Sequence, residues 1–231
     1  MRRLWGLMLP LLLSACASSS PHHDDAAADK TESEAPHLKE GEIHADLIRR
    51  MLDNGQYYAA LAHIEDQKRS TGGDELTLLE ADARSHLGQV AQADALYRKL
   101  LGTRYAGQAY HGLGLLYAAT DLEGAIRNLR IAVERVPTDV DFRNDLGYAL
   151  MEAGRYTEAM PQLSTAAELA PSQLKSRNNL IILMMLVGNE GAVQRLAQES
   201  AATPQRMQQL RDSAQLIRDK QRARTVKAAG Q

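Results

Sequence analysis

The sequence predicts an all-α fold: a solenoid of about five stacked helix pairs, followed by a C-terminal helix that caps them. Only 4% of the residues are aromatic while 44% are hydrophobic, a composition that favours close-packed helices over sheets. A column of alanines recurs at spacings of 32 to 34 residues along most of the chain. The final segment then carries one apolar stripe at helical spacing, which predicts an amphipathic end helix.

The repeating column places one small and one large residue on the same face of a helix. Its members are Ala60, Ala93, Ala125, Ala159 and Ala192, each followed four residues later by Ile64, Tyr97, Leu129, Leu163 and Leu196. A small residue lets a second helix approach closely, and the large residue one turn later fills the groove between the two helices. Because such a pair cannot bury its apolar face alone, neighbouring pairs are expected to stack.

Glycines and prolines mark the ends of the expected helices. Glycine precedes four of the five alanines by four or five residues, at Gly55, Gly88, Gly154 and Gly188, and it permits the left-handed backbone of a tight turn. Proline recurs at Pro137, Pro171 and Pro204, where we expect it to stop the second helix of a unit. The repeat domain therefore spans 41–204, with units at about 41–73, 74–106, 107–139, 140–173 and 174–204.

The first helices of these units carry a family motif. The third unit contains Tyr110, Leu113, Gly114 and Tyr117, and the fourth contains Leu146, Gly147 and Leu150. With the period of about 34 residues, these residues resemble the tetratricopeptide repeat (TPR). The resemblance implies a helix–turn–helix unit and a protein-binding groove made by the first helices.

Helical phasing assigns nine side chains to that groove, all on the first helices of the third, fourth and fifth units. They are His111, Leu115, Asp141, Asn144, Tyr148, Met151, Lys175, Asn178 and Ile182. A groove of this kind suits an extended peptide or an amphipathic helix. The two asparagines could bond the backbone of such a peptide or satisfy their own neighbours, and the sequence leaves both interpretations open.

The N-terminus predicts export and lipid anchoring. Two arginines precede an apolar run over residues 4–13, which is too short to span a bilayer. Residues 13–16 then read Leu-Ser-Ala-Cys and end in the only cysteine of the chain, Cys16. They resemble the bacterial lipobox, which implies a signal peptide over 1–15 and an N-acyl diacylglycerol on Cys16. The alternative is an ordinary secretory signal with an incidental cysteine.

The residue after the cysteine is Ala17 rather than aspartate, and the resemblance to sorting signals then favours the periplasmic face of the outer membrane. Residues 16–40 have no apolar periodicity, so the lipidated cysteine is expected to continue into a flexible tether.

At the other end of the chain, residues 205–231 are expected to form a capping helix and a basic tail. The stripe consists of Met207, Leu210, Ala214 and Ile217, and Arg218, Lys220, Arg222 and Arg224 follow it. We expect these cations to be solvated at a helix C-terminus, although a basic tail could also hold nucleic acid or anionic lipid.

No motif points to an enzyme, a metal site or a nucleic-acid-binding protein. The seven histidines have no spaced partner, and neither GxSxG, HExxH nor a P-loop is present. His22 and His23 beside two aspartates could capture a metal transiently, but a solvated linker is the favoured interpretation. The formal charge of −2 gives no electrostatic argument for nucleic acid. We therefore expect no catalysis and no cofactor beyond the lipid.

The stretch over residues 144–150, followed by Gly154, Arg155 and Tyr156 and by Arg-Asn-Asn-Leu at 177–180, resembles the TadD family. These are TPR lipoproteins of the tight-adherence (Tad/Flp) pilus assembly system. The resemblance implies an accessory, pilotin-like role, in which the groove binds the pilus secretin or another Tad assembly protein. A type IVa pilus pilotin is the nearest alternative. A periplasmic scaffold that docks proteases or peptidoglycan enzymes is an alternative of a different class.

Overall fold

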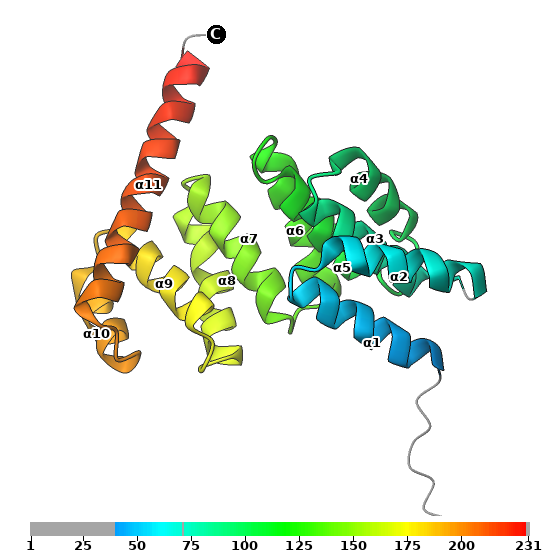
Figure 1. The fold of residues 1–231 in the computed structure, drawn as a ribbon. Helices are drawn as coiled ribbons and strands as arrows, with labels where there is room; N and C mark the ends of the chain where they lie inside the picture. Colours follow the sequence, from blue (N-terminus) through cyan, green and yellow to red (C-terminus); the bar gives the residue numbers. More distant parts are fainter. Residues whose placement is uncertain (1–39, 71, 230–231) are drawn as a thin grey trace, which may run out of the picture. The chain divides into compact units, whose positions relative to one another are not determined.

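The computed structural model describes residues 40–229 except residue 71, and every regular element in this part of the chain is a helix (Figure 1). Each of the five predicted units contains one helix pair. The pairs are α1 (Glu40–Asp53) with α2 (Tyr57–Ser70), α3 (Asp74–His86) with α4 (Val90–Lys99), α5 (Ala106–Tyr117) with α6 (Leu122–Arg135), α7 (Val140–Glu152) with α8 (Tyr156–Leu169), and α9 (Leu174–Leu186) with α10 (Glu190–Glu199). A long helix, α11 (Pro204–Ala229), follows them. The predicted signal peptide, Cys16 and the tether up to residue 39 lie outside the described residues.

The turns within the pairs form as the glycine pattern predicts. Gly55, Gly88, Gly154 and Gly188 have φ values of 72°, 71°, 76° and 74°, in the left-handed region that glycine tolerates best. The third unit has no glycine there. Instead, the carboxylate of Asp121 accepts a hydrogen bond of 2.8 Å from the backbone N–H of Gly124 and so caps the N-terminus of α6.

The expectation for proline is wrong at one of the three positions. Pro137 and Pro171 follow the ends of α6 and α8, as predicted. Pro204 does not stop a helix, because α10 already ends at Glu199 and Pro204 is the first residue of α11. Proline suits that first position, where its missing N–H would have no partner within the helix.

The alanine column lies in the core, as predicted. Ala60, Ala93, Ala125 and Ala159 are completely buried, and Ala192 is 6% exposed. The structure also explains the leucine–glycine pairs of the first helices. A Cβ atom on Gly147 would lie 2.6 Å from Cγ of Leu163, so the large residue of the second helix sits directly on the backbone of the first.

The C-terminal helix packs through its apolar stripe, as predicted, and it also covers a surface that the sequence did not indicate. Leu210, Ala214 and Ile217 are buried, and Met207 packs against the same cluster. The helix contacts the first helices α9 and α7, and Figure 1 shows it beside α9. It therefore covers part of the face on which the groove was predicted, in addition to closing the last repeat. None of the helices described is both long enough and apolar enough to cross a membrane.

Candidate functional site

The predicted groove residues lie on one side of α5, α7 and α9, which we call the first-helix face. Leu115 is 49% exposed on α5. Asp141 and Lys175 are exposed on α7 and α9, and His111 and Tyr148 are partly buried. These five side chains are accessible at least in part, so this portion of the face is a surface that a partner can reach.

Three of the predicted groove residues do not line an open surface, and the expectation that they do is wrong. Asn144 and Met151 are completely buried, and Ile182 is 4% exposed. Met151 and Ile182 belong to the same apolar cluster as the stripe of α11, because that helix lies over this end of the face. Helical phasing places these residues on the correct side of their helices, but it does not reveal that α11 covers them.

The two predicted groove asparagines, Asn144 and Asn178, lie in different surroundings. Asn144 donates a hydrogen bond of 3.0 Å to Asp145 Oδ1 and accepts one of 2.9 Å from Asn179 Nδ2. Of the two interpretations that the sequence left open for Asn144, the structure shows the second, in which it satisfies its own neighbours. Asn178 lines a separate hollow beside the connection between α10 and α11, together with Leu174 and Arg206.

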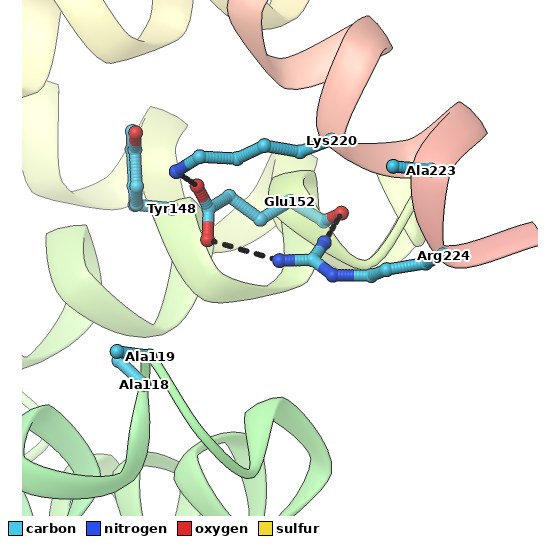
Figure 2. Close-up of a pocket in the computed structure, with 7 residues that line it drawn as sticks. All are labelled: Ala118, Ala119, Tyr148, Glu152, Lys220, Ala223 and Arg224. Carbon is cyan, nitrogen blue, oxygen red and sulfur yellow. Dashed lines mark hydrogen bonds and ion pairs between the residues drawn. The ribbon is translucent and has the colours of Figure 1, made fainter. Parts of the chain in front are cut away.

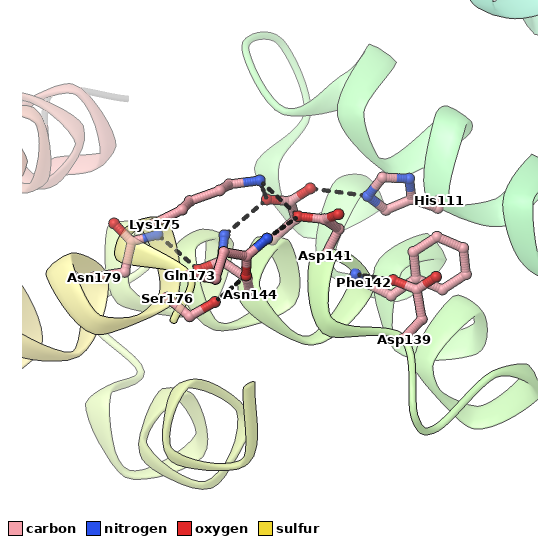
Figure 3. Close-up of polar contacts among 10 residues, drawn as sticks. His111, Asp139, Asp141, Phe142, Asn144, Gln173, Lys175, Ser176 and Asn179 are labelled. Carbon is pink, nitrogen blue, oxygen red and sulfur yellow. Dashed lines mark hydrogen bonds and ion pairs between the residues drawn. The ribbon is translucent and has the colours of Figure 1, made fainter. Parts of the chain in front are cut away.

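A polar network joins the three first helices (Figure 3). His111 Nε2 lies 2.9 Å from Asp145 Oδ2, and Lys175 Nζ lies 2.9 Å from Asp145 Oδ1. Lys175 also lies 3.4 Å from Asp141 Oδ1, and the ring of His111 stacks on Phe142 with the centroids 4.4 Å apart. Asp145 on α7 therefore ties α5 on one side to α9 on the other.

The surroundings of Asp145 and Lys175 favour the ionised form of both side chains. Burial would by itself raise the pKa of Asp145, but the hydrogen bond from His111 and the charge of Lys175 outweigh it and lower that pKa below 3.8. Burial likewise opposes the charge of Lys175, yet its bond to Asp145 leaves the pKa of the ammonium raised. Asp145 and Lys175 therefore stay ionised near neutral pH.

Sequence reasoning missed Asp145, although a signal for it was present. His111 and Asp145 are 34 residues apart, and so are Asp141 and Lys175. Positions one repeat period apart lie at the same level of neighbouring first helices, so polar pairs at this spacing predict bonds between units.

A pocket of about 500 Å³ opens between α7, α11 and the end of α5 (Figure 2). Its lining residues are Ala118, Ala119, Tyr148, Glu152, Lys220, Ala223 and Arg224. Burial raises the pKa of the Tyr148 hydroxyl, and the neighbouring Glu152 carboxylate raises it further. The pocket thus combines small apolar groups and a neutral phenol with three charged side chains.

The charged side of the pocket is built by the docking of α11 on α7. Lys220 Nζ lies 2.5 Å from Glu152 Oε1, and Glu152 is only 6% exposed. Arg224 donates a hydrogen bond of 2.8 Å to the backbone carbonyl of Glu152, and Gln221 donates one of 2.8 Å to that of Met151. These carbonyls end α7, where the helix dipole is negative and cations are favourable.

Three of the four cations after the stripe do not simply lie in solvent, as expected, but also bind the repeats. Lys220 and Arg224 bind Glu152, and Arg218 donates a hydrogen bond of 2.8 Å to the carbonyl of Met185 at the end of α9. Only the side chain of Arg222 remains largely solvated, at 76% exposure. The cations do lie at helix C-termini, but at those of the repeats rather than of α11 alone.

The described residues contain no group of three or more histidine, cysteine, aspartate or glutamate side chains that could hold a metal ion. What the face offers chemically is a set of hydrogen-bond donors and acceptors, an exposed leucine and a mixed pocket. These features suit the binding of another polypeptide.

Residues 115–173 match the model of the tetratricopeptide repeat family. The TPR repeat-containing protein PA4299 of Pseudomonas aeruginosa is 35% identical over 159 residues, which are 68% of this chain and 64% of that protein. The chain thus spans slightly less than two thirds of the length of this relative.

Solved structures resemble the chain at low sequence identity. A thermophilic TPR protein from Thermus thermophilus is 20% identical, with a TM-score of 0.59 over 76% of this chain and 97% of that one. MamA AMB-1 is 20% identical, with a TM-score of 0.54 over 68% of this chain and 95% of that one. Structural similarity at this low sequence identity shows the fold alone. Residues 115–173 thus carry tetratricopeptide repeats, and the chain as described has the TPR helical-repeat fold.

Proposed function

We propose that this chain is an outer-membrane lipoprotein whose first-helix face binds a protein of a tight-adherence (Flp) pilus assembly system, most directly its secretin. The observation that carries the binding role is the accessible part of that face. Leu115 is exposed there, about one helical turn before Ala118, which lines the pocket together with Tyr148. The TPR fold supports protein binding as such. The resemblance to TadD supports the choice of the pilus system.

The proposed role is accessory and non-catalytic. Cys16 would carry the lipid, and a tether of about twenty flexible residues would give the repeats a reach of roughly 25 Å from the membrane. Holding a partner at the membrane raises its local concentration there, so assembly can be promoted without any bond being made or broken.

A capture experiment with matched leucine variants tests this function. The epitope-tagged full-length chain is purified from detergent-solubilised membranes of cells that assemble Flp pili, and the secretin is quantified by immunoblot. Leu115→Glu places a charge on the first-helix face, whereas Leu169→Glu places one at the end of the second helix α8. The two leucines are 49% and 45% exposed, so both variants are expected to fold.

We expect Leu115→Glu to reduce secretin capture by about tenfold or more, because a few central contacts carry most of the affinity of an interface. Leu169→Glu should capture as the wild type does. Equal capture by both variants would place the binding site elsewhere. A wild-type chain that captures only cell-wall enzymes or a protease would replace the pilus assignment by the scaffold alternative.

A further inference from the structure

We infer that the pocket between α5, α7 and α11 is the docking point for an acidic segment of the partner, with Lys220 and Arg224 as its charged contacts. The inference rests on the proposed function, because it names the chemistry of the segment that the first-helix face would bind. Three observations support it: unused donors, a small apolar floor, and the charge distribution of the chain.

Lys220 and Arg224 have more N–H donors than their bonds to Glu152 use. A lysine carries three N–H donors and an arginine five. Among the described residues, Lys220 bonds only to Glu152 Oε1, and Arg224 donates to the Glu152 carbonyl while lying 3.7 Å from its Oε2. Both cationic side chains are 44% exposed, whereas that of Glu152 is 8% exposed. Two cations against one buried carboxylate leave a positive charge facing the pocket.

The remaining lining restricts what can accompany the acid. Ala118, Ala119 and Ala223 contribute methyl groups, and Tyr148 contributes its ring. Figure 2 shows the two alanines at the end of α5 across from the ion pairs, with the pocket between them. A segment in which an aspartate or glutamate stands beside a small or aliphatic residue fits both sides of such a site.

The charge distribution directs an acidic segment to this place. Residues 204–229 contain seven basic and two acidic side chains, whereas residues 40–203 contain sixteen basic and twenty-two acidic ones. An acidic segment is therefore repelled by the repeats in general and attracted where α11 crosses them. An anionic membrane could meet the exposed Arg222 from outside, but a flat surface does not enter a hollow, so the pocket favours a peptide.

A peptide-display selection on the full-length chain in detergent tests the inference. A random peptide library is selected against the wild type, and the binding of the enriched peptides is then measured for two variants. Ala223→Phe fills the pocket while leaving every residue of the ion pairs in place. Ala91→Phe places the same ring on α4, at an alanine that is likewise exposed in a helix.

We expect the enriched peptides to contain aspartate or glutamate beside an aliphatic residue. They should bind Ala223→Phe about tenfold or more weakly than the wild type and bind Ala91→Phe unchanged. Binding should also weaken as salt rises, because the contact is between charges.

The experiment distinguishes a failure of the pocket inference from a failure of the proposed function. Enriched peptides that lack acids, or that bind Ala223→Phe as well as the wild type, would overturn the pocket assignment while leaving peptide binding by the repeats intact. A library from which the wild type enriches nothing would contradict the protein-binding function itself. Binding to phosphatidylglycerol vesicles but not to phosphatidylcholine vesicles, without peptide enrichment, would assign α11 to the membrane surface instead.

Discussion

Asp145 links three repeats through one carboxylate. It accepts a bond from His111 of the preceding unit and pairs with Lys175 of the following one, both at 2.9 Å, while Asn144 donates to it within its own helix. Apolar packing between helices fixes distance but tolerates sliding, whereas a carboxylate with several directed partners fixes the register of one unit on the next.

The substitution Asp145→Asn is expected to lower the free energy of unfolding by about 1–3 kcal/mol near neutral pH, because it leaves partly buried partners without their charge. The folded-state pKa of Asp145 lies below the reference value of 3.8. Its stabilising contribution is therefore present above about pH 4 and is lost as the pH falls through the folded-state pKa. Urea unfolding of both proteins over this pH range measures the difference.

The difference in the free energy of unfolding between the wild type and Asp145→Asn should become smaller as the solution is acidified. Asp141→Asn is the control, because the side chain of Asp141 is 56% exposed and its pairing with Lys175 is longer, so it should cost little. A gap that widens on acidification, or an Asp145→Asn variant as stable as the wild type near neutral pH, would contradict this account of the network.

Ala159 tests the close approach of α7 and α8. It is completely buried, so Ala159→Leu should overpack the helix pair and cost about 1–3 kcal/mol. Glu158→Gln, at the neighbouring surface position, should cost little, because exposed ion pairs contribute little. Thermal melts of the two variants compare them directly, and an Ala159→Leu variant that melts like the wild type would refute the tight packing.

At the scale of elements, the helix pairs could be predicted from the sequence because each depends on local signals that recur. The buried alanines, the positive-φ glycines and the 34-residue spacing act within one unit or between neighbours. The position of α11 could not be predicted in this way. Its stripe shows that one face is buried, but not which surface receives it, since Met151 and Ile182 are equally apolar whether a partner or the chain itself covers them.

The two halves of α11 are held by different forces. Up to Ile217 the helix is anchored by buried apolar residues, and beyond it the interactions with α7 and α9 are polar, with Val226 73% exposed. Glu152→Gln removes the charge that Lys220 and Arg224 share. We expect amide hydrogen exchange over 218–226 to become about tenfold faster or more, while exchange over 204–217 stays unchanged.

High salt should also speed amide hydrogen exchange over 218–226 in the wild type, because it screens the partly exposed ion pairs. It should have less effect on Glu152→Gln, where the carboxylate charge is already absent. If Glu152→Gln leaves exchange over 218–226 as slow as in the wild type, this half of the helix is not held by the ion pairs.

At the scale of the whole molecule, the resemblance of residues 13–16 to a lipobox predicts how the chain is retained at the membrane. Cys16→Ser removes the sulfur that would carry the lipid, and no described helix can replace it as a membrane span. The variant should leave the outer-membrane fraction, either as a released repeat domain or as an unprocessed precursor. Fractionation of cells with an immunoblot measures this, and normal outer-membrane retention of Cys16→Ser would contradict the proposed anchor.

Photo-crosslinking in living, piliated cells tests most directly whether the first-helix face binds a pilus assembly protein at the outer membrane. A benzophenone amino acid is placed at Leu115, which is 49% exposed on α5, or at Leu169, which is 45% exposed at the end of α8. We predict an adduct of the chain with the secretin from position 115 alone, and its loss when Cys16→Ser is added. Absence of a secretin adduct from position 115, or adducts of equal strength from both positions, would contradict this account.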